Sequence, residues 1–239
     1  MSDLTEEKAL AANRSLTYVQ SGMLIGLGSG QTAAFVIGGL GERVRRGEIY
    51  INVVTTSQRS ADLASKAGLT AIPFDGSLKV DLTIDGADEI GPGLVLNKGG
   101  AGALLREKIL AFNSEKLIIV ADSRKPVRVL GTATLTTEVL PFGWVGALKS
   151  MREEFNIHVI RRLDSHGNIV LTEQGNYLLD CLFGHIPEPE VLSQKLRNIP
   201  GVLETGLFVG LASLAIVAKG MTIQELGRDW DGNNLASQQ

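Results

Sequence analysis

Four short apolar segments, each followed by a polar or glycine-rich turn and then a helical pattern, most constrain how this chain can fold. They occupy residues 23–27, 51–55, 80–84 and 117–121. Apolar strands that alternate with helices are typical of a doubly wound, mostly parallel sheet. In such sheets ligands bind outside the carboxyl ends of the strands, where all of these polar turns would fall. The spacing therefore predicts an α/β, Rossmann-like fold with a small-molecule site along one edge.

The pattern changes between residues 131 and 203, where short strands are grouped around two helices. We expect helices at 145–155 and 187–197 and strands at 157–161, 168–171 and 176–181. This order indicates a small α+β domain of ferredoxin-like type, inserted into the first domain. Apolar residues at 202–208 and 214–217 are expected to return to the large sheet. The sequence therefore predicts a large domain made of residues 1–130 and 204–239, and a small inserted domain made of residues 131–203. Because the small domain holds few catalytic candidates, we expect it to serve in subunit contact.

Composition excludes several classes of function. The net charge is -3 and no basic run exceeds a pair, which disfavours nucleic acid as a partner. The lone Cys181 has no disulfide partner, and the three histidines lack metal-ligand spacing, so no metal is expected. Without a signal pattern or an apolar run of membrane-spanning length, the sequence predicts a cytoplasmic protein that does not bind membranes.

The densest polar segment, residues 85–108, combines acids, a lysine and a glycine-rich turn. Asp85 and Asp88 follow the third strand, and Lys98 opens a Lys-Gly-Gly-Ala-Gly turn before a helix predicted at 103–112. Aspartates often cap turns, but capping does not explain three acids facing a glycine-rich helix start. The segment is best interpreted as the reaction centre of a small-molecule site. Glu89 is assigned either to a structural role or to contact with the residues that surround the reacting groups.

Glu107 is distinguished by its neighbours on the predicted helix. The residues three and four positions away are all apolar: Ala103, Leu104, Leu110 and Ala111. A solvated acid in an Arg-Glu-Lys run is the alternative, but the apolar neighbours favour a buried carboxylate. Such a carboxylate is suited to act as a base near neutral pH.

An earlier turn, Gly-Ser-Gly-Gln-Thr at residues 28–32, has the composition of an anion site. Glycines let backbone N–H groups approach an anion at a helix start, and Ser29 and Thr32 add hydroxyl donors. The turn is not a Walker motif, and a plain tight turn remains an alternative. A dinucleotide site is disfavoured because Thr55-Thr56-Ser57, rather than an acid, ends the second strand.

Taken together, these motifs resemble type A ribose-5-phosphate isomerase. The matching motifs are GLGSGQTA at 26–33, TTS at 55–57, DGADE at 85–89, KGGAGALLREK at 98–108, DSRK at 122–125, EQGNYLLD at 173–180 and PGVLETGLF at 200–208. They follow the family's order over nearly the whole chain. Gln31, Ala101 and Arg124 depart from residues common in the family, and none of these departures removes a reacting group.

The resemblance implies interconversion of ribose 5-phosphate and ribulose 5-phosphate in the pentose phosphate pathway, without cofactor or metal, by a homodimer or homotetramer. It assigns Glu107 as the base and places Asp85, Asp88 and Lys98 on the reacting oxygens. The implied substrate and phosphate contacts are Ser29, Gly30, Gln31, Thr32, Gly86, Ala87, Gly99, Gly100, Ala101, Lys125 and Lys8.

The residue types agree with this chemistry. Aldose–ketose isomerisation needs a base, a stabiliser for an enediolate oxygen and a proton carrier between two oxygens. Glu107, Lys98 and Asp88 can supply these three functions. A non-catalytic sugar-phosphate sensor would lack a base such as Glu107 and would carry a DNA-binding segment. A sugar-phosphate deaminase or an acyl-CoA transferase would need a histidine in these turns or a nucleophilic glutamate in another context.

Overall fold

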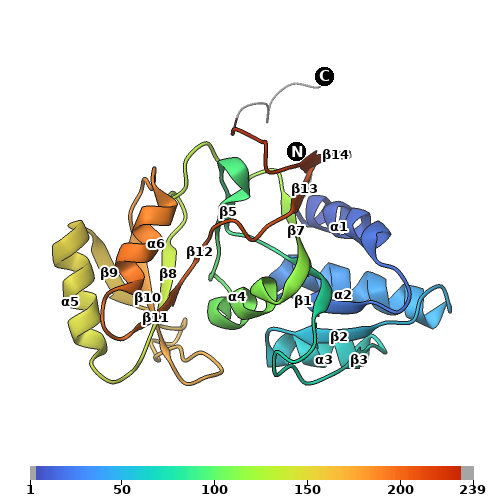
Figure 1. The fold of residues 1–239 in the computed structure, drawn as a ribbon, viewed down its shortest axis with the longest axis horizontal. Helices are drawn as coiled ribbons and strands as arrows, with labels where there is room; N and C mark the ends of the chain where they lie inside the picture. The colour runs from blue at the N-terminus through green and yellow to red at the C-terminus, as the bar shows by residue number, and fades with distance from the viewer. Residues whose placement is uncertain (1–3, 233–239) are drawn as a thin grey trace.

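A seven-stranded sheet organises the larger part of the molecule (Figure 1). The computed structural model describes residues 4–232. The strands are β1 (Leu24–Leu27), β2 (Asn52–Thr55), β3 (Thr70–Ala71), β4 (Val80–Asp85), β7 (Ser114–Asp122), β13 (Leu214–Lys219) and β14 (Thr222–Leu226). Their order is β14-β13-β7-β4-β1-β2-β3; β14 runs antiparallel to β13, whereas the other neighbouring pairs are parallel.

Helices cover both faces of this sheet because successive side chains of a strand point to opposite sides. The helices are α1 (Leu4–Ser15), α2 (Gly30–Arg45), α3 (Gln58–Lys66) and α4 (Leu104–Phe112), with short 3₁₀ turns at Leu16–Tyr18 and Pro92–Leu94. On β7, Ile118 and Val120 pack in the core shared with α1 and α2. Leu117 and Ile119 pack on the opposite side, in the core that contains Ala111 of α4. The predicted doubly wound fold is confirmed.

A second, four-stranded antiparallel sheet forms the smaller part of the molecule (Figure 1). Its elements are β8 (Leu135–Val139), α5 (Trp144–Phe155), β9 (His158–Arg161), β10 (Tyr177–Leu182), α6 (Pro189–Arg197) and β11 (Val202–Thr205). The strand order is β11-β8-β10-β9, and both helices pack on the sheet through one apolar core. A β-α-β-β-α-β chain in this order has the predicted ferredoxin-like arrangement.

A three-stranded antiparallel sheet, which was not predicted, takes two strands from the segment between β4 and β7 and one from the segment between β11 and β13. It consists of β5 (Glu89–Ile90), β6 (Leu96–Asn97) and β12 (Leu207–Phe208), in the order β12-β6-β5. β6 leads directly into Lys98, whose backbone N–H donates to the Gly206 carbonyl at 2.8 Å. This small sheet therefore fixes the start of the glycine-rich turn.

Two predicted elements differ from the structure. Residues 168–171 form only isolated bridges, Leu163 with Ile169 and Leu171 with Tyr177, because they lie in a hairpin end instead of a ladder. Residues 202–208 do not return as one strand, since β11 pairs with β8 in the small sheet and β12 pairs with β6. The expected boundary at 203/204 thus falls inside β11, and residues 1–3 and 233–239 of the expected large domain lie outside the described residues.

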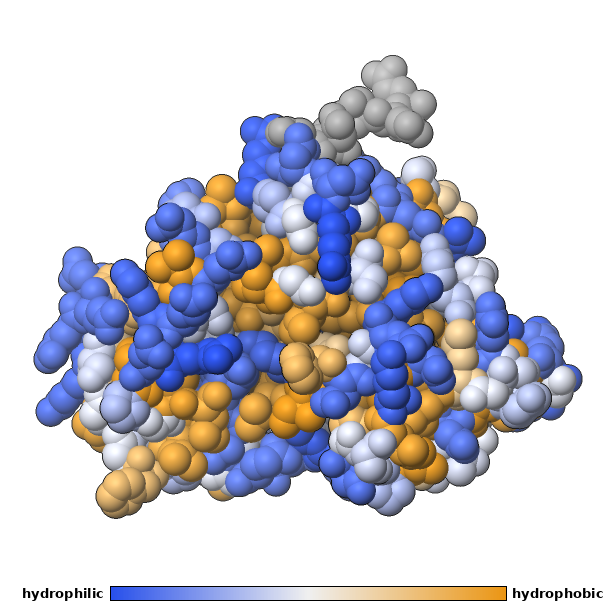
Figure 2. Space-filling view, in the orientation of Figure 1, coloured by the Kyte–Doolittle hydropathy of each residue, from blue (hydrophilic) through white to orange (hydrophobic). Residues whose placement is uncertain are grey.

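Apolar side chains gather on the face where α4 and β12 lie (Figure 2). A groove of about 430 Å³ runs beside this side of α4, with Ile109, Phe112 and Leu207 among its lining residues. Lys108 also lines this groove, whereas the preceding residue, Glu107, lines a different cavity. Helix α4 thus presents two adjacent residues to two chemically different surroundings.

Candidate active site

A polar cavity of about 210 Å³ lies at the carboxyl ends of β1, β4 and β7, three neighbouring strands of the large sheet. Its lining residues come from α1, the start of α2, the turns after β4, β6 and β7, and α4. They are Lys8, Ser29, Gly30, Gln31, Thr32, Gly86, Ala87, Asp88, Lys98, Gly99, Gly100, Ala101, Glu107 and Lys125. All of these residues were predicted, and of the predicted set Asp85 alone is absent from the lining.

Three charged side chains form a buried cluster at this cavity. Lys98 Nζ lies 2.9 Å from Asp85 Oδ2 and 3.2 Å from Glu107 Oε2, and it donates to the Gly86 carbonyl at 2.5 Å. Asp85, Lys98 and Glu107 are 2%, 4% and 3% exposed. The predicted burial of Glu107 is confirmed, but its carboxylate contacts both the Ser29 hydroxyl and Lys98 Nζ, so its surroundings are not purely apolar. Asp85 lies behind Lys98 rather than at the cavity wall.

The cluster changes the proton affinities of its members. Burial, followed by the charge of Glu107, raises the pKa of Asp85 to about 7. Burial on its own would lower the pKa of Lys98, but the charges of Asp85 and Glu107 outweigh it and raise that pKa. Lys98 is therefore a fixed cation, and Asp85 changes its protonation near neutral pH.

Gly28 is required for this cluster to form. A Cβ atom built on Gly28 would lie 1.8 Å from Asp85 Oδ1 and 2.0 Å from Asp85 Cγ. Any side chain at position 28 would therefore displace the Asp85 carboxylate, whose Oδ1 accepts the Gly86 N–H at 2.7 Å and whose Oδ2 pairs with Lys98. The glycine turn between β1 and α2 thus serves close approach as well as turn geometry.

The first turn of α2 faces the cavity with Gly30, Gln31 and Thr32. Ser29 occupies the N-cap position but does not cap the helix, because its hydroxyl donates to Glu107 Oε1. Gln31 Oε1 accepts a hydrogen bond from Lys8 Nζ at 2.9 Å, which brings α1 to the same place. A helix start next to lysines favours an anionic group.

Asp88 is held by the glycine-rich turn that follows β6. Its Oδ2 accepts the backbone N–H of Gly100 at 2.8 Å, and its own N–H donates to the Asn97 carbonyl at 2.8 Å. These contacts place the carboxylate at the cavity wall. Glu89 does not line the cavity. Its carboxylate accepts the N–H groups of Gly131 and Ala133, which gives it a structural role.

Two other polar strand ends have structural roles. Ser57 caps α3 by accepting the Ser60 N–H at 3.1 Å. Asp122 accepts the N–H of Arg124 at 3.1 Å and also pairs with the Arg124 side chain. Arg124, one of the departures from the family pattern, thus does not line the cavity, although Lys125 next to it does.

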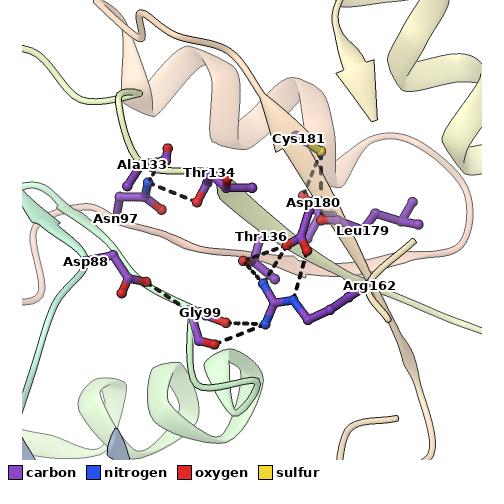
Figure 3. A network of polar contacts seen from close by, with 12 residues as sticks. Asp88, Asn97, Gly99, Ala133, Thr134, Thr136, Arg162, Leu179, Asp180 and Cys181 are labelled. Carbon is purple, nitrogen blue, oxygen red and sulfur yellow. Dashed lines mark hydrogen bonds and ion pairs between the residues drawn. The ribbon is translucent and has the colours of Figure 1, made fainter. Parts of the chain in front are cut away.

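Sequence reasoning missed two residues that support the site. Glu7 is buried and accepts the N–H groups of Ser123 and Gly220, which ties α1, and with it Lys8, to the ends of β7 and β13. Arg162 donates to the carbonyls of Gly99 and Gly100 from the small sheet (Figure 3). The Arg161-Arg162 pair was visible in the sequence, but only as a short basic run.

Within residues 4–232, no group of three or more histidine, cysteine, aspartate or glutamate side chains could hold a metal ion. In the same part of the chain, no helix combines the length and apolarity needed to cross a bilayer.

The fold and the cavity define an α/β protein with a buried acid-base cluster beside the start of a helix and two lysines. The profile of the family Ribose 5-phosphate isomerase A (phosphoriboisomerase A) matches residues 52–221. The chain is 43% identical to ribose-5-phosphate isomerase A of Parvibaculum lavamentivorans over 92% of this chain and 98% of that protein. It is 47% identical to ribose-5-phosphate isomerase A of Gloeobacter violaceus over 90% of this chain and 94% of that protein.

Solved structures agree with these relatives. A D-ribose-5-phosphate isomerase in complex with phospho-erythronic acid is 34% identical, with a TM-score of 0.91 over 94% of this chain and 99% of that one. The ribose 5-phosphate isomerase A of Methanocaldococcus jannaschii is 30% identical, with a TM-score of 0.89 over 94% and 100%. The chain belongs to the ribose 5-phosphate isomerase A family, which confirms the resemblance and leaves the sensor interpretation without support.

Proposed function

We propose that this protein interconverts D-ribose 5-phosphate and D-ribulose 5-phosphate through an enediolate, in the pentose phosphate pathway. The observation that carries the proposal is the Lys98–Glu107 pair at 3.2 Å, which places a base next to a fixed cation in one small cavity. A base beside a cation is the arrangement needed to remove a proton from carbon while the adjacent oxygen gains negative charge.

The carbon-bound proton is assigned to Glu107. In the open-chain aldose, Glu107 removes the proton from C2, and the electron pair of that bond forms the C1–C2 double bond as charge moves to O1. Glu107 then returns the proton to C1. The Ser29 hydroxyl, which donates to Glu107 Oε1, leaves Oε2 next to Lys98 and fixes the orientation of the carboxylate.

The oxygen-bound proton is assigned to Asp88, which accepts it from O2 and delivers it to O1. Lys98 stabilises the enediolate charge, and its own charge is secured by Asp85 and Glu107. Asp85 is 2% exposed, so we assign it an indirect role through Lys98 instead of the expected contact with substrate oxygens. The carbon and oxygen protons therefore follow separate routes.

The phosphate is assigned to the start of α2. Backbone N–H groups of this first turn, the Thr32 hydroxyl, Lys8 and Lys125 supply donors and positive charge at one part of the cavity. Gly86, Ala87, Gly99, Gly100 and Ala101 are assigned to the sugar, since short side chains let the backbone approach it. We further propose that the protein works in the cytoplasm. We also propose that it forms a homodimer or homotetramer, which light scattering of the purified chain would test.

Glu107→Gln tests the proposal because it keeps the shape of the base and removes its basicity. We expect kcat to fall by at least about 1,000-fold in a coupled assay of ribose 5-phosphate conversion. The Kd for ribose 5-phosphate, measured by calorimetry, should stay within about threefold, since the phosphate site is elsewhere.

The matched control is Glu115→Gln, which alters an exposed glutamate paired with Lys79 at 2.6 Å. This variant should keep full turnover. Retention of more than a tenth of kcat by Glu107→Gln would refute the assignment of the base.

A further inference from the structure

We propose that Arg162, from the small sheet, is a positioning residue that fixes the Asp88 carboxylate through a single peptide group. The inference rests on the proton-carrier role proposed for Asp88. Arg162 Nη1 donates to the Gly99 carbonyl at 2.9 Å, and the Gly100 N–H donates to Asp88 Oδ2 at 2.8 Å. The Gly99 carbonyl and the Gly100 N–H are the two ends of one peptide bond, and Figure 3 shows Arg162 and Asp88 on either side of it.

This peptide needs an external restraint. It joins two glycines, and Gly99 has a φ of +115°, a conformation that residues with side chains rarely adopt. Because the carbonyl and N–H of a planar trans peptide point in opposite directions, rotation of the plane breaks both hydrogen bonds together. Arg162, by holding the carbonyl, therefore also holds the N–H on Asp88.

The guanidinium is itself fixed by residues outside the cavity. Arg162 donates through Nε to Asp180 Oδ2 at 2.9 Å and through Nη2 to Asp180 Oδ1 at 2.5 Å and Thr136 Oγ1 at 2.6 Å. The two-pronged pairing with Asp180 of β10 offsets the charge of Arg162 and leaves Nη1 aimed at the turn (Figure 3). A lysine cannot reproduce this planar fork.

Packing completes the restraint. A Cβ atom on Gly99 would lie 2.8 Å from Thr136 Cβ, so the turn lies directly against β8. The small sheet contributes no residue to the cavity lining but holds the turn from behind with Arg162, Asp180 and Thr136. This assigns the small sheet a part in catalysis: it sets the position of a carboxylate that it does not touch.

Arg162→Met and Arg162→Lys test the inference. We expect Arg162→Met to lower kcat by about 10- to 100-fold with KM changed less than about threefold, because a misplaced carboxylate slows proton transfer more than it weakens binding. Arg162→Lys keeps a positive charge next to Asp180 and is therefore expected to fold. It should lose less activity than Arg162→Met. Arg161→Met is the matched control, because Arg161 stacks on Trp144 at 4.3 Å, away from the turn; it should keep kcat within about twofold.

A double-mutant cycle with Asp88→Ala separates this inference from the proposed function. If Arg162 acts through Asp88, Arg162→Met should cost less than about threefold in kcat once Asp88 is alanine. Normal turnover of Asp88→Ala would overturn the role proposed for Asp88 and the inference with it. A slow Asp88→Ala enzyme combined with fully active, folded Arg162→Met and Arg162→Lys variants would overturn the inference alone, as would an equal loss in both backgrounds.

Discussion

Lys98 and Lys108 lie on the same aromatic ring and differ in almost everything else. Their Nζ atoms are 5.5 and 4.8 Å from the centroid of the Phe208 ring. Lys98 pairs with two carboxylates, Asp85 and Glu107. Lys108 pairs with Glu204 at 2.9 Å and donates to the carbonyls of residues 205 and 207, each at 2.7 Å.

The number of neighbouring carboxylates decides whether the pKa of each lysine is raised or lowered. Burial lowers the pKa of Lys108, and one carboxylate, Glu204, does not compensate. The same burial acts on Lys98, but two carboxylates overcome it and raise the pKa. Lys108, which donates to backbone carbonyls, links segments of the chain. Lys98, which lies beside the cavity with two carboxylates, stays positively charged and can interact with a substrate. Three variants test this distinction.

Lys98→Met should have the largest effect. It keeps most of the side-chain length and removes the cation that stabilises the enediolate, so kcat should fall by about 100- to 1,000-fold. Steady-state kinetics with ribose 5-phosphate measures this loss. A decrease smaller than tenfold would show that another group carries the oxygen charge.

Asp85→Asn makes Lys98 resemble Lys108 by leaving it one carboxylate. In the wild type, the folded-state pKa of Asp85 is about 7, above its ordinary value of 3.8. The folded protein therefore binds more protons than the unfolded chain between these values, and this group's contribution to stability is lost as pH rises from about 4 to about 7. The slope is up to about 1.4 kcal/mol per pH unit.

Urea denaturation at pH 5, 6, 7 and 8 should show this decline in the wild type and a smaller decline in Asp85→Asn. Equal slopes for the two proteins would mean that Asp85 does not hold its proton in the folded state.

Lys108→Met should have the smallest effect on turnover. We expect kcat to change less than about threefold, because Lys108 faces the apolar groove and not the cavity. The free energy of unfolding should fall by about 1–3 kcal/mol, since carbonyls of Thr205 and Leu207 lose a charged donor. Thermal and urea unfolding measure the loss. A loss of turnover as large as that of Lys98→Met would erase the distinction between the two lysines.

Local sequence pattern was sufficient to predict the strand ends and the burial of Glu107, whereas most of the cavity lining was predicted from the resemblance to the family. Residues 80–84 alternate strictly, which fixes where Asp85 and the following turn must lie. Glu107 was placed by helical spacing alone, and its burial followed. These features depend on neighbours within four positions, and such short-range information is present in any single sequence.

The features that were missed depend on residues far apart in the chain. The two-residue strands β5, β6 and β12 are too short for any periodicity. The Ser29–Glu107 hydrogen bond joins positions that only the packing of α4 against the β1 end brings together. Arg162 had no signal beyond its charge, because its targets are backbone carbonyls of glycines, which carry no side-chain pattern.

The chain order of the large sheet has a consequence for synthesis on the ribosome. Every residue that lines the cavity has emerged by Lys125, yet β7 acquires β13 as its neighbour only when residues 214–219 follow the whole small sheet. Until then the growing chain presents the bare edge of β7, at Ile118–Asp122, in its most apolar part. Exposed edges of this kind invite pairing with other chains, so the nascent protein passes through an interval in which it is open to aggregation, and slow translation of residues 131–213 would lengthen that interval.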